Sequence, residues 1–117
     1  MFKALQTLGS FQIREQYQVG EKLRIDFVIL ELRLGVEFDG SQHYEFNGHF
    51  YDSKIAFKQA QARDKRKDEL CRQANIMLVR LDEQTIKKAK DAESLAKEIL
   101  KRVQEKRIQS LTEYDEW

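Results

Sequence analysis

The stretch LRIDFVILELRLGVEFD, residues 23–39, decides the fold. It contains two runs, 23–30 and 34–39, that are rich in β-branched and aromatic residues, which favour strands. The segment before them, 12–17, alternates between polar and apolar residues and is followed by a turn at 19–21. We therefore expect three consecutive strands that form an antiparallel meander.

A helix and a fourth strand should follow the meander. The polar loop 40–51 leads to a predicted helix from about residue 53 to residue 74, with Asn75 as its C-terminal stop. The apolar run IMLVRL, residues 76–81, is typical of a strand that is buried on both faces. Because a strand reached through a helical crossover normally pairs in parallel, this one should make the sheet mixed.

Helices are also expected at the two ends of the chain. Residues 2–8 resemble the end of an amphipathic helix, and residues 85–107 carry apolar side chains every three or four positions, which predicts a scaffold helix against the core. The acidic segment 110–117 has no such period and is expected to fray. The predicted fold class is α/β, an α-β-β-β-α-β-α sandwich over residues 1–109 with an acidic C-terminal tail at 110–117.

Length and composition exclude several classes of protein. The chain has 117 residues, of which 41% are hydrophobic and 35% charged, and this suits a single domain. No apolar stretch approaches the ~18 residues that span a bilayer, and the first ten residues lack a signal-peptide pattern, so we expect an intracellular, cytoplasmic protein. The single cysteine, Cys71, excludes an internal disulfide, and a zinc finger is excluded because no Cys/His spacing repeats.

The net charge of +1 hides an asymmetry along the chain. Residues 1–53 carry more acidic than basic groups, whereas residues 54–107 carry 16 basic and 9 acidic groups. A basic half beside a carboxylate-rich half suits a protein that holds both a polyanion and a cation. Charge-rich helices in ordinary soluble proteins have a similar composition, so charge alone does not decide between these interpretations.

Three carboxylates occupy the predicted central strands. Glu37 and Asp39 are two residues apart and should point to one face, with Val36 and Phe38 on the other. Pairing of the two strands can bring Asp26 beside Glu37. These carboxylates either face water or share a hard divalent metal such as Mg²⁺, because clustered like charges otherwise cost stability.

The loop after these strands offers a candidate general base. His43 follows Gly40 closely enough to reach the acidic residues, and an imidazole can exchange a proton near neutral pH. His49 lies in the same loop. Either histidine can equally be an ordinary polar loop side chain.

The predicted helix after the loop is basic. Its residues Lys54 and Lys58, and likewise Arg63 and Lys67, are spaced i, i+4 and could follow phosphate groups. Interspersed acidic residues favour a solvated face for part of this helix. Cys71, near its end, fits a core position better than a nucleophile.

Four segments together resemble the very-short-patch repair (Vsr) endonucleases. They are still more similar to the Vsr-like nuclease domains of phage and mobile-intron homing endonucleases, the EDxHD group, within the PD-(D/E)XK superfamily. The segments are RIDFV at 24–28, GVEFDGSQHY at 35–44, ARDKRKDEL at 62–70 and IMLVR at 76–80. The resemblance covers about residues 11–82 and implies a restriction-endonuclease-like sandwich with a mixed central sheet.

The resemblance also implies a metal site. Asp26 matches the family's metal-binding aspartate, Glu37 matches the acid of the second strand, and the peptide carbonyl of Phe38 would be a further ligand for Mg²⁺ or Mn²⁺. Family members often carry a glutamate in the N-terminal helix, but this chain has none before Glu15.

Asp39 departs from the superfamily, which has lysine at this position. The resemblance therefore implies that the general-base or phosphate-polarising role has moved to another side chain. His43 is the first candidate, with Gln42, Lys54 and Lys65 behind it. Asp64 matches a family aspartate on the following helix and could orient His43.

These observations predict a Mg²⁺-dependent endonuclease that hydrolyses phosphodiester bonds in double-stranded DNA. The expected nucleic-acid contacts are Lys54, Lys58, Arg63 and Lys65. Without a long basic arm, target selection would lie elsewhere in a larger protein. The alternative is a non-catalytic nucleic-acid-binding module that keeps the fold and uses its carboxylates structurally.

Overall fold

The computed structural model describes residues 1–20, 22–39 and 54–115, with side chains described as far as residue 109. Within these ranges the chain forms α1 (Phe2–Gln6), β1 (Arg14–Gly20), β2 (Leu23–Ile29), the 3₁₀ turn η1 (Leu30–Leu32), β3 (Leu34–Asp39), α2 (Lys54–Gln73), β4 (Met77–Asp82), α3 (Glu83–Lys88) and α4 (Ala92–Asp115). No helix among the described residues is long and apolar enough to cross a membrane.

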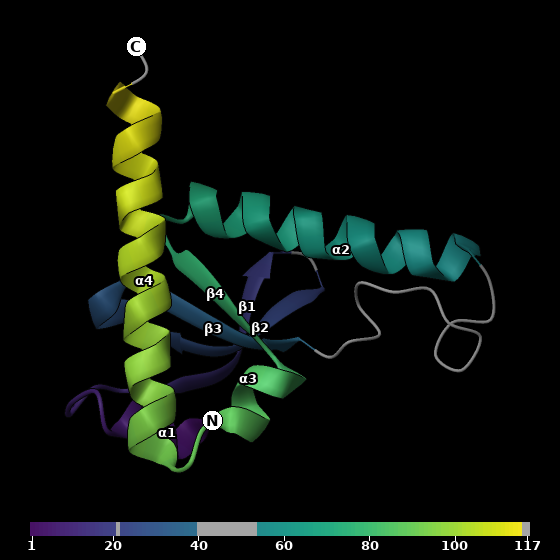
Figure 1. Ribbon diagram of the computed structural model, residues 1–117. Helices are drawn as coiled ribbons and strands as arrows, with labels where there is room; N and C mark the ends of the chain where they lie inside the picture. The colour runs from purple at the N-terminus through teal and green to yellow at the C-terminus, as the bar shows by residue number, and fades with distance from the viewer. Residues whose placement is uncertain (21, 40–53, 116–117) are drawn as a thin grey trace.

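The strands form one mixed sheet in the order β1-β2-β3-β4 (Figure 1). β1 pairs antiparallel with β2, and β2 pairs antiparallel with β3. β4 pairs in parallel with β3, with Leu34 opposite Met77 and Asp39 opposite Asp82. The predicted α/β sandwich with a mixed sheet is thus confirmed, and the two acid-bearing strands are the central ones.

The sheet separates two apolar clusters. Ile29, Val36 and Leu81 belong to the larger cluster with α1 and with the buried stripe of α4, which comprises Leu95, Ala96, Ile99 and Val103. Ile25, Val28 and Leu78 belong to the smaller cluster with Cys71 of α2. Figure 1 shows α2 and α4 crossing the sheet in different directions, with α1 near the start of α4. The helix at 85–107 was therefore correctly predicted to be scaffold.

The single helix predicted at 85–107 is two helices, however. The Asp82 carboxylate accepts the N–H of Thr85 at 2.7 Å, and the Asp91 carboxylate accepts the N–H of Ser94 at 2.8 Å. Asp82 caps the start of α3 and Asp91 caps the start of α4, and the helix is interrupted between Lys88 and Ala92. The apolar period continued through the break and did not reveal it.

Both ends of the chain differ from the expectation. α1 ends at Gln6, two residues before the predicted helix end. α4 continues to Asp115, so most of the backbone of the segment 110–117, expected to fray, is helical. No glycine or proline occurs between 92 and 115 to stop the helix.

α2 ends as predicted. Asn75 adopts a left-handed conformation with φ of 59°. The N–H of Ile76 then bonds to the carbonyl of Cys71 at 2.8 Å, and the N–H of Asn75 to that of Arg72 at 3.1 Å. This pattern stops the helix and directs the chain into β4.

The open edge of β4 is covered by basic side chains of α4. Arg102 Nη1 donates to the Arg80 carbonyl at 2.7 Å, and Lys106 Nζ donates to the Leu78 carbonyl. Leu78 and Arg80 are two residues apart, so their carbonyls point to the same edge of the strand.

Candidate active site

Asp26 lies where the pairing of β2 with β3 stops. The register runs from Ile29–Leu34 to Phe27–Val36. At the next position the Asp26 carboxylate takes over, because its Oδ2 accepts the N–H of Phe38 at 2.9 Å. Gln16 Nε2 on β1 donates to Oδ1 at 3.4 Å. Two strands therefore fix the orientation of this partly buried carboxylate.

Glu37 and Asp39 are buried, with only 7% and 2% of their surfaces exposed. Glu37 Oε1 lies 2.5 Å from Lys67 Nζ on α2, and its Oε2 lies 3.4 Å from Arg80 Nε. Asp39 Oδ2 lies 3.9 Å from the same Arg80 nitrogen. The two carboxylates share a face, as predicted. That face does not meet water, because the basic groups of α2 and β4 lie against it.

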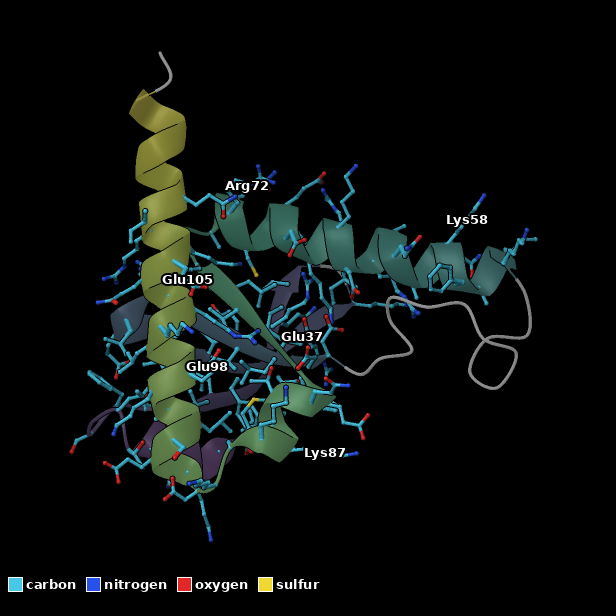
Figure 2. All side chains as sticks on the ribbon, viewed as in Figure 1. Glu37, Lys58, Arg72, Lys87, Glu98 and Glu105 are labelled. Carbon is cyan, nitrogen blue, oxygen red and sulfur yellow. The ribbon has the colours of Figure 1, made fainter. Side chains whose placement is uncertain are left out.

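Arg80 connects β4 to α2. Its Nη1 donates to Asp68 Oδ1 at 2.7 Å, and its Nη2 donates to the peptide carbonyl of Asp64 at 3.0 Å. The guanidinium therefore touches carboxylates of β3 and groups of α2 at once. In Figure 2 Glu37 lies in the body of the molecule, below α2, whereas Lys58 lies at the far end of that helix and points outward.

The electrostatics of Glu37 reflect burial against neighbouring charges. Burial raises the pKa of the Glu37 carboxyl, and the nearby Asp26 charge adds to this, while Lys67 and Arg80 act in the opposite direction. For Arg80, burial disfavours the charged form, but Asp68, Asp64 and Glu37 outweigh it and raise the pKa. The Asp26 carboxylate accepts the N–H of Phe38, the residue after Glu37, and this places its charge near Glu37.

Asp26 and Glu37 are the residues that could contribute oxygen ligands to a hard divalent cation. Glu37 Oε2 is buried and has no hydrogen-bond partner among the described residues, since the Arg80 contact is an ion pair without hydrogen-bond geometry. Mg²⁺ favours one or two carboxylates together with water and phosphate oxygens, and Asp26 and Glu37 supply two. Among the described residues no group of three or more His, Cys, Asp or Glu is arranged around a common point. The Phe38 carbonyl as a third ligand stays a prediction.

Two of the predicted site residues, Gln42 and His43, lie outside the described residues. Asp64 is partly buried on α2, and its peptide carbonyl accepts Arg80. Because His43 is outside the described residues, the predicted role of Asp64 in orienting it stays a prediction. Glu15 is exposed on β1, and the neighbouring Gln16, not Glu15, donates to Asp26.

The four residues predicted to contact nucleic acid are all exposed on α2: Lys54, Lys58, Arg63 and Lys65. Arg63 also lines a surface pocket of about 410 Å³ with Lys22 and Arg66. Lys22 and Arg66 were not among the predicted contacts. The pocket places three basic side chains between the β1–β2 turn and α2.

Lys67 and Arg80 are the site residues that sequence reasoning missed. Lys67 was grouped with Arg63 as a phosphate contact, but it turns inward to Glu37. Arg80 was included in an apolar strand. The available signal was a cation within a buried run, since an arginine there needs a carboxylate partner. Cys71 is 1% exposed, and burial raises its pKa to about 11, so the core interpretation of this thiol is confirmed.

No family model and no solved structure matches this chain. Among curated proteins, the chain is similar to the uncharacterized protein 307L of Invertebrate iridescent virus 6, with 44% identity over 57 residues, which are 49% of this chain and 29% of that protein. It is also 38% identical over 60 residues to the uncharacterized protein 033L of Invertebrate iridescent virus 3, which covers 51% of this chain and 31% of that protein. The matched part is less than a third of either relative.

Proposed function

We propose that this chain is the catalytic domain of a metal-dependent DNA endonuclease, Vsr-like or of the homing type, that uses Mg²⁺ or Mn²⁺. The observation that carries the proposal is the buried Glu37 carboxylate, one oxygen of which has no hydrogen bond within the described part of the chain, beside Asp26 at the end of the β2–β3 pairing. A buried carboxylate near a second one is costly in an ordinary core and useful where a cation binds.

Asp26 and Glu37 would hold the metal ion. The ion, when bound, would polarise the scissile phosphate and lower the pKa of the attacking water. The chain holds the two ligands beside each other, Asp26 through the N–H of Phe38 and Glu37 through its ion pair with Arg80. His43 is proposed to accept the proton of the water on a ring nitrogen.

Double-stranded DNA would lie along α2. Lys54, Lys58, Arg63 and Lys65 are exposed on this helix, and the pocket lined by Lys22, Arg63 and Arg66 continues the basic surface towards β2. Phosphate contacts of this kind orient a duplex without reading its sequence. Target selection is therefore assigned to a region outside this domain.

Nicking of a supercoiled plasmid tests the proposal. We expect the wild-type chain to nick with Mg²⁺ or Mn²⁺ and to stop when EDTA is added. Asp26→Asn should lower cleavage at least ~100-fold, because it removes a ligand charge at nearly constant volume, while its amide oxygen can still accept the N–H of Phe38. Glu93→Gln, at an exposed position of α4, is the control, with the same loss of charge and no expected effect.

Wild-type activity in Asp26→Asn would remove Asp26 from the mechanism.

A folded wild-type chain that binds DNA but never cleaves it would favour the alternative, a non-catalytic nucleic-acid-binding module. The observation that favours this alternative is the internal pairing of the acids. Glu37 and Asp39 face Arg80, and Asp26 accepts a peptide N–H, so all three can serve the fold. Binding that is equal in EDTA and in Mg²⁺ would fit it.

A further inference from the structure

We propose that Lys67 is an internal counter-ion of Glu37 that a divalent cation displaces when it binds to this carboxylate. The inference rests on the proposed function and adds a residue of this chain to it. It follows from which cations touch Glu37, and from how firmly each of them is held.

Lys67 occupies one of the two oxygens that Glu37 can offer. The ammonium nitrogen lies 2.5 Å from Oε1, and the two side chains are only 17% and 10% exposed. A charge-assisted contact in a partly buried position is stronger than a surface ion pair. Lys67 therefore neutralises Glu37 at Oε1, and a metal ion bound to this carboxylate through either oxygen would lie close to the ammonium group.

The second cation at Glu37 is fixed in place. Arg80 donates to the Asp68 carboxylate and to the peptide carbonyl of Asp64, both on α2. If Arg80 moved away from Glu37, it would still be held by Asp68 and by the carbonyl of Asp64. Its planar guanidinium would lose both of these hydrogen bonds if it moved.

Lys67 is held less firmly. Within the described part of the chain, the hydrogen bond of its ammonium goes to Glu37. Its stem of four methylene groups can rotate, and the side chain is partly open to solvent. Of the two cations beside Glu37, Lys67 is the one that can leave without breaking another contact of β4 with α2.

The charges then predict a competition. A divalent ion and an ammonium group at the same carboxylate repel each other in a partly buried site, where water screens them poorly. Metal binding must therefore separate Lys67 from Glu37 and loses part of its affinity in doing so. Removal of the Lys67 charge should strengthen metal binding, although the residue belongs to the site.

The test is calorimetric titration of Mn²⁺ into the DNA-free chain at low ionic strength. We expect Lys67→Met to bind Mn²⁺ at least about tenfold more tightly than the wild type, since one full charge at contact range is worth more than that factor. Lys65→Met removes the same charge from an exposed position of the same helix and is the matched control, expected to differ less than about twofold. Lys67→Arg, which keeps the charge, should bind like the wild type or more weakly.

Thermal denaturation is a second measurement of the same competition, and like the titration it does not depend on activity. Lys67→Met leaves the buried Glu37 without its ammonium partner, so Mn²⁺ should raise the melting temperature of this variant more than that of the wild type. If Lys67→Met does not fold, Lys67→Gln, which loses the charge but can still donate a hydrogen bond, replaces it in both experiments.

The outcomes separate the two proposals. Mn²⁺ binding that Lys67→Met leaves unchanged or weakens overturns the inference about Lys67 and leaves the metal site in place. No Mn²⁺ binding in the wild type, in either charge-removing Lys67 variant or in Lys65→Met overturns the metal-dependent function and this inference with it. Binding that appears or tightens only when the Lys67 charge is removed supports the displacement.

Discussion

Arg80 is the residue on which the candidate site depends. It contacts Glu37 and Asp39 on β3 and Asp68 on α2, while its own carbonyl accepts Arg102 of α4. A buried ion pair contributes little when it is compared with an apolar replacement of both partners. Loss of one partner is costly, because the remaining charge stays buried without compensation.

Arg80→Met is therefore expected to destabilise the fold by about 3–5 kcal/mol, because Glu37 and Asp39 keep their burial and lose a cation. Urea denaturation followed by circular dichroism measures this difference. Arg72→Met removes an exposed arginine of α2 and should change stability by less than about 0.5 kcal/mol. Equal stability of the two variants would contradict the role given to Arg80.

Sequence reasoning found the acids of the site and missed their cations, for a physical reason. Asp26, Glu37 and Asp39 belong to neighbouring strands, and the side-chain period of two predicts which of them share a face. Lys67 and Arg80 reach Glu37 from 30 and 43 positions away. That meeting depends on how α2 lies over the sheet, and no local period encodes it.

At the scale of elements, α2 combines an inner and an outer role. Ala60 and Cys71 are the buried residues of this helix, and Lys67 faces the acids. Lys54 and Lys58 lie in its N-terminal half, where Lys58 points away from the body (Figure 2). The helix can therefore contact a duplex with one end while its inward face stays on the sheet.

Substitution of both Lys54 and Lys58 by alanine should weaken DNA binding and lower the salt slope by up to about 1.8, since each phosphate contact contributes about 0.9. Fluorescence anisotropy with a labelled duplex in EDTA, at several salt concentrations, measures the slope. The exposed pair Lys97 and Lys101 on α4 has the same spacing and serves as the control. If both double variants lower the slope equally, α2 has no special part in binding.

The elements themselves were largely predictable, because β2 and β3 have a β-rich composition, β4 is a short apolar run and α2 has a definite stop at Asn75. The first strand was predicted too short, because β1 continues to Gly20, into the predicted turn at 19–21. The break between α3 and α4 was not predicted. Asp82 and Asp91 cap two helices whose apolar positions stay in one continuous period, so the period hid two local hydrogen bonds. The helical extension to Asp115 was missed because the acidic segment lacks an apolar stripe, although nothing in it stops a helix.

At the scale of the whole molecule, the two edge strands of the sheet, β1 and β4, are protected in different ways against pairing with another chain. At β4, Arg102 and Lys106 occupy the outward carbonyls of Arg80 and Leu78. At β1, the register shifts between Gln18 and Gly20, and Gln16 has a positive φ of 50°. An irregular strand is a poor surface for pairing with another chain, and so is a strand whose carbonyls are already occupied.

Replacement of both Arg102 and Lys106 by methionine should make the chain self-associate, because it exposes the β4 edge and adds apolar surface beside it. Sedimentation velocity over a range of concentrations detects this. Lys97 and Lys101, both replaced by methionine, add the same apolar surface to α4 and leave the hydrogen bonds of Arg102 and Lys106 to β4 in place. Association in that control as well would assign the effect to hydrophobicity alone.

The covered β4 edge also affects the resistance of the chain to aggregation at high protein concentration. An open strand acts as a template, because its free backbone groups can recruit an extended segment of another molecule and convert a native sheet into the seed of a fibril. With Arg102 and Lys106 in place, an incoming segment must first break two hydrogen bonds to cationic side chains. Pairing of a misfolded chain with this edge is therefore opposed, and the energy barrier to it comes from two side chains of α4, a helix whose other face packs on the core.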